Sequence, residues 1–124
     1  MKTALFIGLG GFAGSIARYY VSKLNLVSTL SILPWGTLLV NVAGSFFLGL
    51  LTGIADRSML LNTEWRMFLM VGFCGGFTTF SSFAGENLSM MRNANFQGLL
   101  IYTSASVLLA FIFVYLGYHL TKLL

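Results

Sequence analysis

Four long apolar stretches constrain this chain more than any other feature of its sequence. They lie at about residues 3–23, 34–54, 64–91 and 97–121, and together they take up most of the 124 residues. Each is long enough to cross a bilayer as a helix, which needs roughly 20 apolar residues. Since 57% of the residues are hydrophobic and only 8% are charged, lipid is the expected solvent. We therefore expect an all-α integral membrane protein with one four-helix transmembrane domain over residues 1–124.

The positive charges are divided almost evenly between the two ends of the expected helices. If the spans alternate in direction, one side holds Lys2, Arg57, Arg66 and Lys122, and the other holds Arg18, Lys23 and Arg92. Membrane helices are oriented by an excess of Lys and Arg on the cytoplasmic side, and four against three is a weak excess. Two interpretations stay open: either other features fix one orientation, or the chain inserts both ways round.

The sequence lacks the patterns typical of enzymes and of nucleic-acid-binding proteins. It contains no metal-ligand cluster and no phosphate-binding loop, and the glycines at 8, 10 and 11 open a membrane span rather than a strand and helix of a nucleotide-binding fold. His119 stands alone near the end of the last span, so a base-assisted nucleophile is not expected. The basic residues are scattered singly and form no patch for nucleic acid.

The third apolar stretch differs from an ordinary membrane helix. Residues 74–83 combine the pair Gly75-Gly76 with four hydroxyl residues and three phenylalanines. A glycine pair followed by two threonines favours a helix poorly where lipid offers no hydrogen bonds, so we expect a break at about 75–79. Backbone freed there must face protein or a water-filled cavity, where its carbonyls can coordinate a cation. The alternative is a continuous helix whose small residues allow close packing.

Several side chains are candidates for the lining of an ion path. Phe80 and Phe83 are three residues apart and so share a helix face. Their positive ring edges can solvate a dehydrated anion, or the rings can serve only for packing. Asn41 lies on a stripe of small and polar residues in the second span, and its amide can join helices or donate to an anion. Tyr102 and Ser106 add hydroxyl groups one turn apart in the fourth span.

Two charged residues lie inside the expected spans. Gly10, Gly14 and Arg18 recur every four residues and so share one face of the first span. The glycines allow close helix contact, and Arg18 either extends to the membrane surface or attracts anions into a vestibule. Glu86 either pairs with a cation from another helix or lies near an aqueous opening.

Four helices are too few to enclose a polar-lined pore, so oligomerisation is expected.

Three motifs together resemble those of the Fluc (CrcB) family of fluoride channels. They are GGFAGSIARY at 10–19, GTLLVNVAGS at 36–45 and, most specific of all, GFCGGFTTFSSF at 72–83. The resemblance extends over essentially the whole chain, including its length and its four spans. It implies a channel in the cell membrane that passively releases fluoride from the cytoplasm and so lowers its toxicity. Hydrogen fluoride enters cells from acid surroundings and dissociates in the neutral cytoplasm, which traps the anion.

The resemblance also implies an assembly and a set of site residues. The assembly is a homodimer of antiparallel subunits in membrane lipid, inserted in opposite orientations, with two fluoride pores and a central structural Na⁺. The family's sodium ligands correspond to the backbone carbonyls of Gly75 and Thr78, and its pore residues to Asn41, Phe80 and Phe83.

Further family positions correspond to polar residues beside that pore. A polar track would include Thr79, Tyr102 and Ser106, and Arg18 would supply the vestibule charge. Ala110 stands where other members continue the track with a hydroxyl group. The main alternative is a small multidrug-resistance exporter, which is also a four-helix protein but needs a carboxylate in its first helix for proton coupling. Residues 3–23 contain no Asp or Glu.

Overall fold

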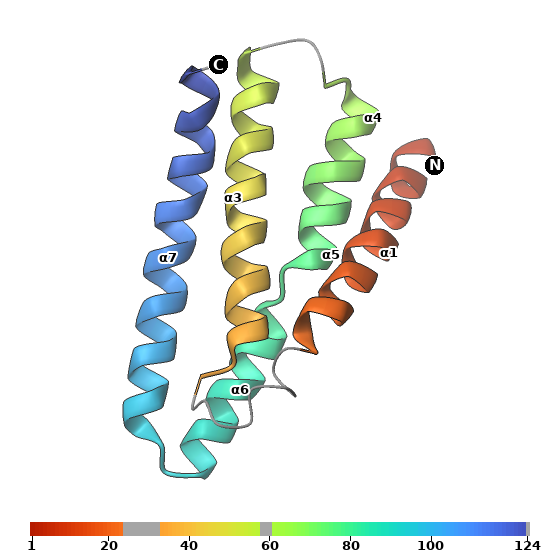
Figure 1. Cartoon of the computed structure of the whole chain (residues 1–124). Helices are drawn as coiled ribbons and strands as arrows, with labels where there is room; N and C mark the ends of the chain where they lie inside the picture. Colours follow the sequence, from red (N-terminus) through yellow and green to blue (C-terminus); the bar gives the residue numbers. More distant parts are fainter. Residues whose placement is uncertain (24–32, 58–60, 124) are drawn as a thin grey trace.

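The computed structural model describes residues 1–23, 33–57 and 61–123, and every element in these ranges is helical (Figure 1). Four of its helical stretches are long and apolar enough to cross a membrane, as the sequence predicts. They begin and end within a few residues of the expected ranges. The elements are α1 (Lys2–Ser22), α3 (Trp35–Arg57), α4 (Thr63–Arg66), η1 (Met67–Cys74), α5 (Gly75–Phe77), α6 (Phe80–Arg92) and α7 (Phe96–Leu123).

The helices pack as two pairs whose members are not neighbours in the sequence. α1 packs against η1 and α5, which belong to the third span, and α3 packs along α7 (Figure 1). α6 continues the third span beyond a break and contacts α7. The third span therefore contacts α1 with its first half and α7 with its second half.

Glycines bring the backbones of α1 and the third span into direct contact. A Cβ on Gly10 would lie 2.1 Å from a carbonyl oxygen of η1, and one on Gly14 would lie 2.2 Å from another. From the opposite side, Cβ atoms on Gly72 and Gly76 would each lie 2.6 Å from a carbonyl oxygen of α1. Small residues at such positions are typical of membrane helix interfaces. We call these four residues the glycine contact.

The α3–α7 pair is built in the same way. A Cβ on Gly49 would lie 2.0 Å from the carbonyl oxygen of Val114, and one on Gly117 would lie 2.2 Å from that of Phe46. Because the helices approach this closely, van der Waals contact between backbones takes the place of a thick side-chain core. Both pairs are therefore fixed in register by glycine.

The break in the third span falls at the two threonines. Thr78 and Thr79 have extended backbone, with φ and ψ of −79° and 158° and of −150° and 115°. The prediction of a break is confirmed, but Gly75 and Gly76 remain helical, which the sequence did not indicate. Gly76 is held against the backbone of α1, and β-branched threonines favour extended backbone. The side chain of Thr79 then caps α6 by accepting from the amide of Ser82 at 3.1 Å.

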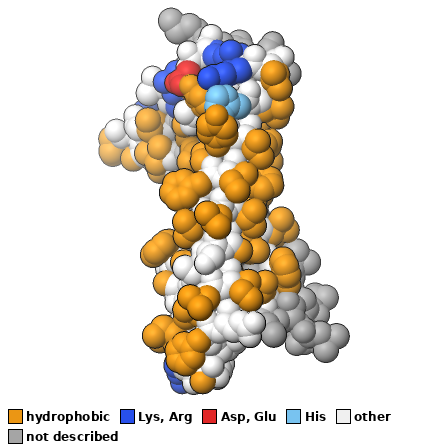
Figure 2. Space-filling view, turned by 90° about the vertical axis from the view of Figure 1, so that its left-hand side faces the viewer, with side chains coloured by type: hydrophobic (Ala, Val, Ile, Leu, Met, Phe, Trp, Pro, Cys, Tyr) orange, Lys and Arg blue, Asp and Glu red, His pale blue; other side chains and the backbone are white. Residues whose placement is uncertain are grey.

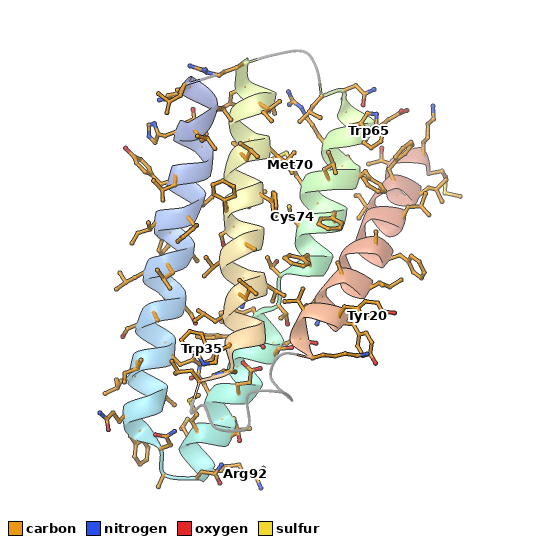
Figure 3. All side chains as sticks on the ribbon, in the orientation of Figure 1. Tyr20, Trp35, Trp65, Met70, Cys74 and Arg92 are labelled. Carbon is orange, nitrogen blue, oxygen red and sulfur yellow. The ribbon has the colours of Figure 1, made fainter. Side chains whose placement is uncertain are left out.

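The outer surface suits a lipid environment. Figure 2 shows apolar side chains along most of the visible face, with charged groups gathered near its ends. Figure 3 places Trp65 near one end of the protein, and Tyr20 and Trp35 toward the other. Tryptophan and tyrosine prefer the two membrane interfaces. Arg92 lies at the far end of α6 (Figure 3), so the molecule is a multi-pass membrane protein with polar ends.

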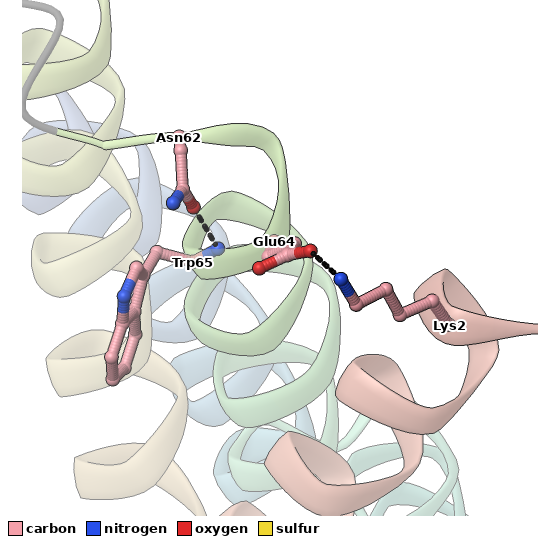
Figure 4. Close-up of polar contacts among 4 residues, drawn as sticks. All are labelled: Lys2, Asn62, Glu64 and Trp65. Carbon is pink, nitrogen blue, oxygen red and sulfur yellow. Dashed lines mark hydrogen bonds and ion pairs between the residues drawn. The ribbon is translucent and has the colours of Figure 1, made fainter.

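Polar contacts at one of these ends connect the starts of α1 and α4 (Figure 4). Lys2 Nζ lies 3.1 Å from Glu64 Oε1, and Asn62 Oδ1 accepts a hydrogen bond of 2.9 Å from the amide of Trp65. An exposed ion pair contributes about 0–1 kcal/mol, so the glycine contact rather than this pair holds α1 in place.

Candidate functional site

The break is held from the side of α3 by the amide of Asn41. Its Nδ2 donates to the carbonyl oxygen of Thr79 at 3.1 Å, and its Oδ1 accepts from the amide of Thr79 at 2.7 Å. Both backbone groups of one non-helical residue are therefore satisfied by one side chain, as buried backbone requires. Thr78 packs beside it on Gly44, where a Cβ would lie 2.2 Å from the threonine methyl group.

Two carbonyl groups at the break lose the donors they would have in a continuous helix. The donor for Gly75 would be the amide of Thr79, which instead donates to Asn41. The donor for Thr78 would be the amide of Ser82, which instead donates to the side chain of Thr79. Unwound carbonyl oxygens are suitable ligands for a hard cation. The residues present therefore fit the Na⁺ site that the family resemblance implies at these two carbonyls.

Arg18 holds the break from the side of α1. Its Nε donates to the carbonyl oxygen of Gly76 at 2.9 Å, and the residue is half-buried. Among the described residues, the ion pair found joins Lys2 to Glu64 and does not involve Arg18. The partner of Arg18 is therefore a backbone carbonyl rather than a carboxylate. A role for Arg18 as a vestibule charge stays a prediction.

A groove of about 510 Å³ runs beside the break, between α3, the third span and α7. Met70 and Cys74, labelled in Figure 3, lie on the side of the third span that faces α3 and both line it. The groove brings together all three predicted pore residues and both predicted sodium ligands. Its lining includes Asn41, Gly44, Ser45, Gly75, Thr78, Thr79, Phe80, Phe83, Ser106 and Ala110.

The aromatic rings form one wall of this groove. The ring centroids of Phe80 and Phe83 are 5.7 Å apart, so the two residues share a face as their spacing predicts. Phe83 also lies 5.2 Å from Tyr102, whereas Phe80 is 81% exposed in the isolated subunit. The wall is therefore open on the side of Phe80.

Ser106 supplies an unsatisfied hydroxyl group to the groove. The residue is 8% exposed, and its Oγ has no hydrogen-bond partner among the residues that the structure describes. A buried polar group left without a partner costs about 1–3 kcal/mol, so native proteins rarely keep one without a use. A ligand that accepts a hydrogen bond would satisfy this hydroxyl.

One helical turn away, a second layer contains the half-buried carboxylate of Glu86. Thr37 Oγ1 donates to Glu86 Oε1 and the Tyr102 hydroxyl donates to Glu86 Oε2, both at 2.5 Å. Tyr102 is fully buried and does not line the groove, whereas Ser106, one turn further along α7, does. The place of Tyr102 on a polar track stays a prediction. Two partners of Glu86 are therefore hydroxyl groups from other helices, an arrangement that the sequence analysis did not foresee.

The two layers are built on the same three helices. Thr37 precedes Asn41 by four residues, and Tyr102 precedes Ser106 by four, which is one turn in each case. Glu86 follows Phe83 by three residues on α6. The four-residue spacings were visible in the sequence, but which helices face each other was not. We call this line of polar and aromatic groups the α3–α6–α7 seam.

A membrane span broken at mid-length, with a groove of ring edges and hydroxyl groups beside the break, defines a small four-helix membrane transport protein. The family model described as CrcB-like protein, Camphor Resistance (CrcB), matches residues 5–118. The chain belongs to this family.

Curated relatives cover nearly its full length. A fluoride-specific ion channel FluC from Azobacteroides pseudotrichonymphae genomovar. CFP2 is 38% identical over 122 residues, 98% of each chain. One of the same name from Pyrococcus abyssi is 39% identical over 122 residues, again 98% of each chain. Another from Chlorobium phaeobacteroides is 43% identical over 123 residues, 96% of this chain and 92% of the relative.

Proposed function

We propose that this chain is a fluoride-specific ion channel that lets fluoride leave the cytoplasm down its gradient and so lowers fluoride toxicity. The protein is a channel and not an enzyme. Its relatives over nearly the full length are named fluoride-specific ion channels. The single structural observation that carries the proposal is the buried hydroxyl of Ser106, which has no partner among the described residues, in a groove walled by Phe80 and Phe83.

The chemistry of the groove suits a small, strongly hydrated anion. Fluoride can leave water only where donors and positive ring edges replace its hydration shell in a narrow path. Ser106 offers a hydroxyl donor, and Phe80 and Phe83 offer ring edges. Asn41 uses one amide hydrogen on Thr79 and has a second hydrogen on the same nitrogen for an anion. We place the fluoride path in the groove, along the layer of the α3–α6–α7 seam that holds Asn41, Phe83 and Ser106.

The exporter alternative lacks its essential residue. A proton-coupled exporter of the small multidrug-resistance type needs a carboxylate in its first helix, and α1 contains none. Glu86 is a membrane carboxylate, but it lies in α6 and accepts from Thr37 and Tyr102.

The working unit in our proposal is a homodimer of antiparallel subunits with two pores. Two features support it. The positive charges are split four against three, which favours neither orientation strongly. The groove is also open at Phe80, which a second subunit could cover. A structural Na⁺ would be held by the Gly75 and Thr78 carbonyls of both subunits and would supply positive charge at the centre of the assembly.

Replacing Phe80 or Phe83 with Ile should lower fluoride efflux about tenfold, since aromatic contacts contribute about 0.5–1.5 kcal/mol beyond their buried area. Isoleucine keeps the apolar bulk but removes the positive ring edge. The measurement is fluoride release from liposomes containing the purified protein, followed with a fluoride electrode. Phe12→Ile is the matched control, because Phe12 is an exposed phenylalanine on α1 outside this groove. Equal rates in all variants, or chloride release as fast as fluoride release from the parent, would refute the assignment.

Reporter fusions at the C-terminus should give both cytoplasmic and external populations. A weak charge bias specifies orientation poorly, so the two forms are expected in comparable amounts. Adding two lysines next to Lys122 should shift the population toward one orientation and reduce channel activity together with the minor form. A single orientation in the parent protein would contradict the antiparallel homodimer.

A further inference from the structure

We propose that Arg18 is a positioning residue that fixes where the third span leaves its helix, acting through a hydrogen bond rather than through its charge. This inference rests on the proposed function, because the carbonyls and the groove at the break matter only if they hold Na⁺ and conduct fluoride. It assigns Arg18 a task different from attracting anions. The observation behind it is the bond from Arg18 Nε to the carbonyl oxygen of Gly76.

The register of α1 brings Arg18 to the break. Gly10, Gly14 and Arg18 lie on one face of α1, four residues apart, and both glycines are buried against the third span. This close contact fixes α1 along η1 and α5, so the third residue of the series meets the end of α5. Arg18 therefore continues the glycine contact with a long side chain where the partner helix stops.

The carbonyl that Arg18 binds has lost its helical donor. In a continuous helix the carbonyl of Gly76 would accept from the amide of Phe80, which lies beyond the extended residues Thr78 and Thr79. An unpaired carbonyl at membrane depth is strongly unfavourable. The Nε–H group of Arg18 supplies the missing donor at 2.9 Å. Arg18 thus stabilises the broken form of the span relative to a continuous helix.

The two adjacent glycines at the end of α5 have different surroundings. A Cβ on Gly76 would collide with the backbone of α1, whereas one on Gly75 would meet nothing within 4 Å. Gly75 is exposed and lines the groove. One residue of the pair is therefore held by α1 while its neighbour stays available on the groove side. Loss of the Arg18 bond would let α5 turn or unwind, and the carbonyls of Gly75 and Thr78 would lose their fixed direction.

Three replacements separate the hydrogen bond from the charge. In Arg18→Gln the amide nitrogen stands the same number of bonds from the backbone as arginine Nε, so the donor is kept and the charge is lost. Arg18→Lys keeps the charge but has a methylene group at the position of Nε. Arg18→Met has similar length and neither property. Arg92→Met is the control for loss of a cation, because Arg92 is exposed at the far end of α6.

The first measurement is hydrogen–deuterium exchange of the purified protein in detergent. Residues 75–83 should exchange about tenfold faster in Arg18→Met than in the parent, with a peptide from α7 unchanged. Arg18→Gln and Arg92→Met should match the parent.

The second measurement compares thermal unfolding in sodium chloride and in N-methylglucamine chloride. Arg18→Met should need about tenfold more Na⁺ for the same stabilisation, and Arg18→Gln should not.

The outcomes decide the proposal clearly. It is overturned if residues 75–83 exchange hydrogen at the parental rate in Arg18→Met. It is also overturned if Arg18→Lys keeps the parental exchange rate and fluoride flux better than Arg18→Gln does, because that result requires an electrostatic role. If Arg18→Met fails to fold, the comparison of Gln with Lys still decides. Exchange at the break does not depend on fluoride, so a parent protein that conducts no fluoride would refute the proposed function and leave the role of Arg18 to be judged by exchange.

Discussion

Asn41→Asp is expected to abolish fluoride flux. Aspartate can still accept from the amide of Thr79, but it cannot donate to the carbonyl of Thr79 as Asn41 does at 3.1 Å. It also places a negative charge in the groove that we assign to an anion. At an effective dielectric constant of 20, two unit charges about 4 Å apart repel by about 4 kcal/mol. Flux should therefore fall by more than about a hundredfold.

The control for this substitution is Asn95→Asp. The side chain of Asn95 accepts from the amide of Gly98 at 3.0 Å at the start of α7, and aspartate caps a helix as well as asparagine does. Fluoride release from liposomes should thus be normal in Asn95→Asp and absent in Asn41→Asp, with both proteins eluting as the parent does on a sizing column. Parental flux in Asn41→Asp would show that Asn41 does not face the path.

Gly10→Val is expected to prevent the assembly of α1 with the third span. The first added carbon would lie 2.1 Å from the carbonyl oxygen of Phe68 and 2.9 Å from the amide nitrogen of Phe73. Both are backbone atoms, so relief requires the helices to separate. Overpacking ordinarily destabilises by about 1–3 kcal/mol, and a clash with backbone belongs above that range.

Gly8→Val is the matched control, because it makes the same change two residues earlier on the same helix. A Cβ on Gly8 would meet nothing within 4 Å. The yield of monodisperse protein and the midpoint of thermal unfolding in detergent should be near the parent's for Gly8→Val and should collapse for Gly10→Val. Similar midpoints for the two variants would mean that the glycine contact is not formed in the membrane protein.

The spans and the break were predictable because each depends on local composition. Length and hydrophobicity locate the helices, and the run from Gly75 to Thr79 favours interruption. The position of the break within that run was not predictable. It depends on Gly76 being held by the backbone of Gly11, which lies far away in the sequence. The π-helical turns of η1 were also unforeseen, since the uniformly apolar segment 67–74 carries no signal for them.

The candidate site was predictable in its residues but only partly in its connections. Spacing alone placed Phe80 beside Phe83, and their rings are indeed neighbours. The partners of Arg18 and Glu86 were not predictable, because both bonds join different helices, over 58 residues for Arg18 to Gly76 and 49 for Thr37 to Glu86. Helical periodicity gives the face on which a residue lies and says nothing about which helix that face meets.

The alternating partnership of the helices sets the order in which this protein can mature during synthesis. α1 finds its partner only when η1 and α5 emerge, and α3 finds its partner only when α7, the last helix, has entered the bilayer. Until then the glycine faces of both early helices face lipid or the insertion machinery. The directions in which α1 and α3 cross the membrane are therefore settled before the helices that they pack against most extensively have been made. The charges in the flanking loops, rather than the packed structure, therefore determine the orientation in which a newly made subunit is inserted.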